Sequence, residues 1–368
     1  MNANKRANNS LNSPGRNFQV RGCYQSEGYV FAKNAAEIGK QHGLERIARL
    51  ASNENPDPPS EEALKLGFAA LSQANRYPDE RQVSLNDSLV AAHGNYPFVT
   101  GVGMDGVIET TIRTLVEPGE LVAVSTPTFS FYRLSAVAQG AGVVEVPRGP
   151  GFTVEPAPFI EACEEAKLAF LCTPNNPTGN GTSPEVVREI LEHIDCVLFL
   201  DNAYVEFSDL NYLPLLRDYD NLIIGRTFSK AYSLAGLRVG YAFVPEWFRP
   251  YYIRAATPHT LNAVSAAAAV GALSDVKHVK TARERVIKWR KELSGRLKYP
   301  VLPSDANFVM VDVAPLTSDE AVERLARMGV LVRSCRSFRG LSDHFVRVSI
   351  GADWENTMCI DAFSRLNV

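Results

Sequence analysis

Short apolar runs alternate with amphipathic stretches along residues 61–275 of the chain. Six of the runs are typical of buried strands: LVAVS (121–125), GVVEV (142–146), LAFLC (168–172), CVLFL (196–200), NLIIG (221–225) and RVGYAF (238–243). Candidate helices lie between most of them. This alternation predicts an α/β fold in which helices cover both faces of a mostly parallel sheet and ligands bind at the carboxyl ends of the strands.

The flanking segments predict a second, smaller domain. Residues 35–50 are expected to be helical, and residues 275–299 form a long charged helix that links two domains. Strands near 308–313, 330–334 and 345–350 then suit a small α+β domain. We therefore expect a disordered tail (1–20), an N-terminal arm with part of the small domain (21–55), a large domain (56–275) and a small C-terminal domain (276–368).

Composition narrows the class of protein. The 368 residues carry a net charge of −3, which gives no basic footprint for nucleic acid. No run approaches the roughly 18 apolar residues of a membrane span, and the first twenty residues lack the apolar core of a secretion signal. The six cysteines are scattered without a C-x-x-C pair, which favours reduced thiols and a cytoplasmic location. We expect no nucleic-acid partner, no membrane partner and no metal.

The stretch GVGMDG (101–106) fits the glycine pattern of a dinucleotide site and precedes a helical pattern. A dinucleotide site also needs an acidic residue about twenty positions on, at the end of the next strand. That strand instead ends at Ser125-Thr126-Pro127. Backbone N–H groups at the start of a helix still form an anion site, so this turn predicts either a phosphate contact or a plain strand-to-helix turn.

Four other stretches follow predicted strands, and each places polar or aromatic residues at a carboxyl edge. They are PTFSFY (127–132), CTPNNPTG (172–179), DNAYVEF (201–207) and RTFSKAYSLAGLRVG (226–240). Because the carboxyl ends of parallel strands meet at one edge of a sheet, these stretches predict one composite site.

The composite site meets the needs of pyridoxal phosphate. This cofactor needs a lysine amine for its aldehyde, a carboxylate for its ring nitrogen and a cradle for its phosphate. The candidates, in that order, are Lys230, Asp201, and the group Thr227, Ser229 and Arg238, while Asn176 and Tyr204 suit the ring oxygen and Phe129 suits one ring face. Each residue alone has a local explanation, such as a turn, a cap or the core, but together they favour the cofactor.

These motifs resemble those of the class I/II aminotransferases, which are pyridoxal phosphate enzymes of fold-type I. The resemblance runs from about Tyr24 to the C-terminus and includes LASNENP (50–56), RYPD (76–79), SDANF (304–308) and FVRVSIG (345–351). It implies a large domain with a mostly parallel sheet and a small α+β domain. It also implies transamination between a phosphorylated amine and 2-oxoglutarate.

The resemblance implies individual roles in cofactor binding and catalysis. Lys230 would bind the cofactor and then carry the proton, Asp201 would pair with the ring nitrogen, and Tyr204 would assist as a third catalytic residue. The backbone of Met104, Asp105 and Gly106 would contact the phosphate. Tyr77 would reach the cofactor phosphate of the neighbouring subunit, which implies a homodimer.

The substrate residues that the resemblance implies are Arg347 for the glutamate carboxylate, Arg333 and Tyr24 for the phosphate of the other substrate, and Asn55. This chain departs from the family pattern at several positions, which are Gly106 and Asn202, where acidic residues are usual, and Pro58, His259 and Thr260 near the expected substrate entrance. The last three bear on the identity of the substrate and not on the cofactor.

Three alternatives share the same scaffold. A threonine-phosphate decarboxylase is disfavoured because no H-G-G-N run occurs near the N-terminus and because Val348, Ser349, Ile350 and Gly351 follow Arg347 as in transaminases. An aromatic amino-acid transaminase would have no use for a phosphate site at Arg333 and Tyr24. A non-catalytic binding or regulatory module would be expected to lack Lys230 or Asp201, and both are present.

Overall fold

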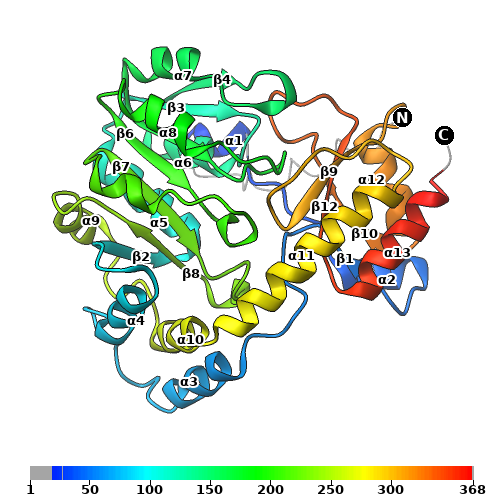
Figure 1. Ribbon diagram of the computed structural model, residues 1–368, viewed down its shortest axis with the longest axis horizontal. Coiled ribbons are helices and arrows are strands. Elements are labelled where there is room, and N and C mark those ends of the chain that lie inside the picture. Colours follow the sequence, from blue (N-terminus) through cyan, green and yellow to red (C-terminus); the bar gives the residue numbers. More distant parts are fainter. Residues whose placement is uncertain (1–18, 27, 367–368) are drawn as a thin grey trace.

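A computed structural model describes residues 19–26 and 28–366 (Figure 1). Residues 1–18 of the predicted disordered tail lie outside the described part. None of the described helices combines the length and the apolar character that crossing a membrane requires.

A seven-stranded sheet forms the centre of the larger part of the chain, and its strands lie in the order β2-β8-β7-β6-β5-β3-β4. The strands are β2 (Phe98–Val102), β3 (Leu121–Thr126), β4 (Gly142–Pro147), β5 (Ala166–Cys172), β6 (Val197–Asp201), β7 (Leu222–Thr227) and β8 (Val239–Phe243). Neighbours from β4 to β7 are parallel, whereas β8 is antiparallel to both β7 and β2. The predicted mostly parallel sheet is confirmed. Strand β2 was missed because its sequence merges into the glycine turn.

Helices bury both faces of this sheet. Alternate residues of a strand point to opposite faces, so Leu198 and Leu200 of β6 join one apolar cluster and Val197 and Phe199 join another. Helices α5 (Gly103–Leu115), α6 (Phe131–Gln139) and α9 (Arg249–Ala255) pack on the second cluster. Helices α3 (Glu61–Leu71), α4 (Val83–His93), α7 (Pro156–Cys163), α8 (Pro184–Leu191) and α10 (Ala263–Ser274) pack on the first.

Helix α11 (Val276–Arg296) links the large sheet to a smaller group of elements, as Figure 1 shows. The side chain of Asp275 caps its first turn by accepting from the N–H of His278 at 3.0 Å. Its residues Val286, Trp289 and Leu293 are buried at spacings of three and four, which explains how so charged a helix is held in place. The long helix predicted for residues 275–299 is therefore present.

The smaller group is built from both ends of the chain. Strands β9 (Phe308–Asp312), β11 (Arg333–Ser334) and β12 (Phe345–Ser349) form an antiparallel sheet, and β1 (Ala48–Arg49) pairs in parallel with β10 (Val330–Leu331). Helices α2 (Ala35–His42), α12 (Ser318–Arg327) and α13 (Asp353–Ser364) belong to this group, whereas α1 (Cys23–Ser26) contacts α6 of the larger part. The single strand predicted near 330–334 is in fact two short strands, because Val330–Leu331 and Arg333–Ser334 pair with different partners.

His93 is the last residue of α4 and packs against β8, where its Nε2 is 3.1 Å from the hydroxyl of Tyr241. Burial and the nearby Arg226 cation lower the pKa of His93 to about 4. An unfolded histidine has a pKa of about 6.5, so below that pH the unfolded chain binds a proton that the folded chain does not. Stability from this histidine is therefore present above about pH 6.5 and is lost as the pH falls toward 4.

We predict that His93 lowers the free energy of unfolding by an amount on the order of 2–3 kcal/mol when the pH falls from 7 to 4.5. Urea unfolding at both pH values measures this change. His93→Gln keeps a polar side chain but cannot take the proton, so its unfolding free energy should depend less on pH by that amount. Equal pH dependence in the two proteins would contradict the prediction.

Candidate active site

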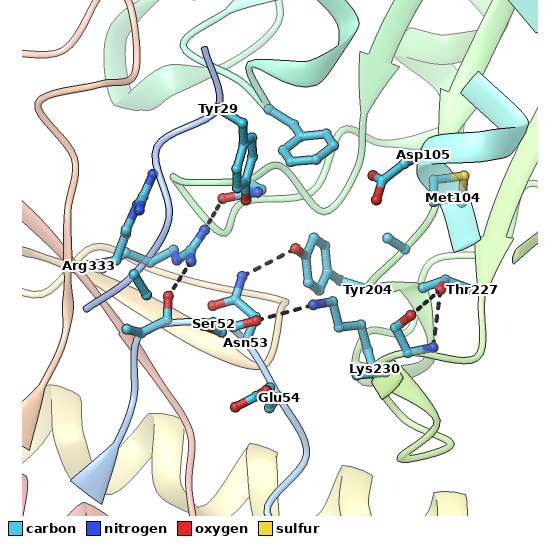
Figure 2. Close-up of a pocket in the computed structure, with 18 of the residues that line it drawn as sticks. Tyr29, Ser52, Asn53, Glu54, Met104, Asp105, Tyr204, Thr227, Lys230 and Arg333 are labelled. Atoms are coloured by element: carbon cyan, nitrogen blue, oxygen red, sulfur yellow. Dashed lines mark hydrogen bonds between the residues drawn. The ribbon is translucent and has the colours of Figure 1, made fainter. Parts of the chain in front are cut away.

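Lys230 lies in the loop that joins β7 to β8, at the carboxyl end of β7 (Figure 2). A short 3-10 turn (Ala235–Leu237) lies between Lys230 and β8. The ammonium of Lys230 donates to the carbonyl of Ser52 at 3.3 Å. Burial and the cation of Arg347 lower the pKa of Lys230 to about 8, which leaves a useful fraction of free amine near neutral pH.

Asp201 is the last residue of β6, the central strand of the sheet, and is 3% exposed. The hydroxyl of Tyr132 donates to its Oδ2 at 2.6 Å, and the N–H of Ala203 donates to its Oδ1 at 3.0 Å. Both donors are neutral. Burial therefore raises the pKa of Asp201 to about 6 despite these hydrogen bonds, and a cation placed beside the carboxylate would lower it again.

A cradle for an anion lies at the start of α5, beside the ends of β7 and β8. Here the hydroxyls of Thr227 and Ser229 are 3.0 Å apart, and Nη2 of Arg238 is 2.5 Å from Oδ2 of Asp105. Helix α5 has no side-chain cap, the N–H of Gly103 donates to the carbonyl of Arg238 at 2.8 Å, and the positive end of the helix dipole lies at this start. Gly103 has a φ of +67°, and a Cβ there would lie 2.5 Å from Nη2 of Arg238. A side chain at this position would therefore strain the turn and displace the guanidinium of Arg238.

Two arginines lie on the opposite side of the site, in the smaller group of elements. Arg347 of β12 is 6% exposed and donates to Oδ1 of Asn176 and, at 2.8 Å, to the carbonyl of Ala51. Arg333 of β11 pairs in register with Arg347, and burial together with the neighbouring Arg347 cation lowers the pKa of Arg333. Two guanidinium groups this close favour anionic ligands.

One cavity of about 410 Å³ joins these groups. Among the residues predicted from the sequence, it is lined by Met104, Asp105, Phe129, Asn176, Asp201, Tyr204, Thr227, Ser229, Lys230, Arg238, Arg333 and Arg347. Four strand ends and the smaller group of elements thus contribute to a single site, as the sequence predicted for the strand ends.

Four predicted residues do not line this cavity. Gly106 lies within the first turn of α5, and Tyr24 of α1 is 62% exposed. The side chain of Asn55 is held by Arg285 at 2.7 Å and by the carbonyl of Ala231 at 3.2 Å. Tyr77 is 84% exposed on the surface of this chain. The roles of these four residues stay predictions.

Other residues of the site were not singled out from the sequence. Tyr132 holds Asp201, although it lies inside the stretch PTFSFY that was assigned to the site. Asn53 donates to the hydroxyl of Tyr204 at 3.2 Å, and Ser52, Glu54 and Tyr29 line the cavity. The signal for Ser52, Asn53 and Glu54 was their position within LASNENP, whereas Tyr29 carried no motif.

Comparisons with known proteins agree with this geometry. Residues 45–366 match the family "Aminotransferase class I and II". A histidinol-phosphate aminotransferase of Methanoculleus marisnigri is 60% identical over 94% of this chain and 99% of its own length. One of Methanosarcina barkeri is 41% identical over 91% and 93%. The chain belongs to the aminotransferase class I and II family, so the resemblance drawn from its motifs is confirmed.

A solved structure agrees as well. The histidinol-phosphate aminotransferase of Sinorhizobium meliloti, crystallised in complex with pyridoxal-5'-phosphate, superposes with a TM-score of 0.85. It is 26% identical and covers 95% of this chain and 98% of its own.

The residues of this chain fit the cofactor of that solved structure. Burial raises the pKa of the Asp201 carboxylate to about 6, and a protonated ring nitrogen beside the carboxylate would lower it again. The cradle of Arg238, Ser229 and the start of α5 suits a phosphate. Between them, Lys230 presents an amine whose pKa is lowered to about 8. The three parts of the cofactor thus each meet a complementary group.

We predict that Gly103→Ala weakens binding of pyridoxal phosphate about 10-fold or more, because the new Cβ displaces the guanidinium of Arg238 and strains the turn. Titration of the cofactor-free protein measures the dissociation constant. Gly295→Ala is the matched control, since it lies in α11 with nothing near its added Cβ. An unchanged dissociation constant in a folded Gly103→Ala protein would show that Arg238 does not hold the phosphate.

Proposed function

We propose that this chain is a transaminase that uses pyridoxal phosphate to move the amino group of L-histidinol phosphate to 2-oxoglutarate. The products are imidazole acetol phosphate and L-glutamate, a step of histidine biosynthesis. The observation that carries the proposal is one cavity that joins Lys230 and Asp201 to two arginines, Arg333 and Arg347. The names of the relatives at 60% and 41% identity support the same substrate.

The bound cofactor supplies an electron-accepting ring that makes the substrate C–H bond acidic. Lys230 first holds the cofactor and, once freed by the incoming amine, takes the proton from the carbon that bears the substrate amine. Its lowered pKa of about 8 suits an amine that must both accept and return a proton near neutral pH. In the second half of the reaction the same amine carries a proton back to the carbon of the oxo acid.

Asp201 keeps a proton on the ring nitrogen. Its ionised form is stabilised by the hydroxyl of Tyr132 and the N–H of Ala203, and both hold the carboxylate in a fixed orientation. Tyr204 and Asn176 face the same cavity and orient the ring oxygen. Burial raises the pKa of Tyr204, so its hydroxyl stays protonated and acts as a donor.

Arg347 and Arg333 bind different anionic groups of the two substrates. Arg347, already fixed by Asn176 and the carbonyl of Ala51, suits the carboxylate common to glutamate and 2-oxoglutarate. The guanidinium of Arg333 donates to the hydroxyl of Ser337 at 3.4 Å and remains suited to a phosphate. Tyr24 and Asn55 are proposed as further substrate contacts.

Two features of the assembly belong to this proposal. The active unit is a homodimer in which Tyr77 of each chain reaches the cofactor phosphate of the other, consistent with a tyrosine side chain that is 84% exposed on one chain. The chain comprises a large cofactor domain (56–275) and a small domain (276–368) to which the N-terminal arm contributes. A cytoplasmic location fits the six cysteines, which are all free thiols in the structure.

Single half-reactions test the function. L-histidinol phosphate, added without any oxo acid, should convert the cofactor to its amine form, and 2-oxoglutarate should reverse the change; the absorbance spectrum reports both steps. L-threonine phosphate serves as the comparison. Release of carbon dioxide from threonine phosphate would make the protein a decarboxylase, and no spectral response to any amine would refute the proposal.

We predict that Arg333→Ala raises KM for L-histidinol phosphate about 10- to 100-fold, because a charged hydrogen bond to the phosphate is lost. KM for glutamate should change less than about threefold. Arg336→Ala is the matched control, since Arg336 lies three positions on and pairs with Asp319 at 2.8 Å outside the cavity. An equal rise in KM for both substrates would assign Arg333 to a general structural role.

A further inference from the structure

The ring of His259 stacks on the ring of Tyr77. Their centroids are 4.6 Å apart and the ring planes are 20° apart, which is the geometry of stacked rings in contact. Tyr77 belongs to the stretch between α3 and α4, whereas His259 lies in the turn that precedes α10. Two segments far apart in the sequence therefore meet at the side chain proposed to enter the neighbouring site.

The backbone at His259 is held in an uncommon conformation. Its φ is +53°, in the left-handed region that side-chain-bearing residues seldom occupy. The turn is fixed on its C-terminal side, because Leu261 is 1% exposed and Asn262 caps α10 by accepting from the N–H of Ser265 at 2.8 Å. The imidazole is thus carried on a turn that is anchored to the core of the large domain.

We propose that His259 is a positioning residue for Tyr77: its ring fixes the orientation in which the hydroxyl of Tyr77 meets the cofactor phosphate of the neighbouring subunit. Tyr77 is 84% exposed, so without a neighbouring ring its side chain would sample several rotamers. Fixing one rotamer before the cofactor binds removes part of the entropy that binding would otherwise lose. This inference rests on the homodimer of the proposed function.

The test is the dissociation constant of pyridoxal phosphate, measured by titrating the cofactor-free dimer at constant pH. His259→Ala should raise it about three- to tenfold, the range expected for the loss of an aromatic pair. His259→Phe restores a flat ring and should return it to within about twofold of the original value. Sedimentation of each variant checks that the dimer persists.

Tyr77→Phe provides the control, because it keeps the ring of Tyr77 and removes only the hydroxyl. If His259 acts through that hydroxyl, His259→Ala should have no further effect in the Tyr77→Phe background. An undiminished effect in that background would overturn the inference and assign His259 a role in the turn alone. An unchanged dissociation constant in Tyr77→Phe itself would instead refute the proposed contact between subunits.

Discussion

Within the described residues, the carboxylate of Asp201 is ionisable, nearly inaccessible to solvent and hydrogen-bonded to two neutral donors, the hydroxyl of Tyr132 and the N–H of Ala203. The fold creates this situation because β6 is the central strand, with three strands on each side and helices over both faces. Its neighbours β5 and β7 end at the same edge, so Cys172 and Gly225 lie in register beside Asp201. A parallel sheet of this order therefore produces a deep polar site at its middle.

Burial acts in opposite directions on the two ionisable groups that matter most. It disfavours charge on both, and thus raises the pKa of Asp201 while it lowers the pKa of Lys230. A ligand with a cationic ring nitrogen and an aldehyde would suit both groups. The ring nitrogen would pair with the carboxylate of Asp201, and the aldehyde would bind the amine of Lys230 covalently. Arg333 and Arg347 stay charged without a bound ligand, because guanidinium groups keep their charge in partly buried sites.

The main strands and the polar residues at their ends could be predicted, because apolar runs and the motifs that follow them are local in sequence. Strand β2 could not, since its last two residues belong to the glycine stretch GVGMDG and its pairing with β8 is long-range. Neither could the bond from Tyr132 to Asp201, which depends on where α6 packs against the sheet. Tyr24 and Asn55 lie away from the cavity for the same reason. Their positions depend on the packing of α1 near α6 and on the hydrogen bonds of Asn55 to Arg285 and to the carbonyl of Ala231.

The pairing of Ala48 with Val330 has a consequence for how the protein is made on the ribosome. All seven strands of the large sheet are complete once Phe243 has been synthesised, so that sheet can assemble while the chain still grows. Strand β1 must wait for a partner that emerges much later, and Arg333 and Arg347, the two cavity arginines of the smaller group, emerge later still. The nascent chain can thus acquire its cofactor pocket before it acquires the means to hold an anionic substrate.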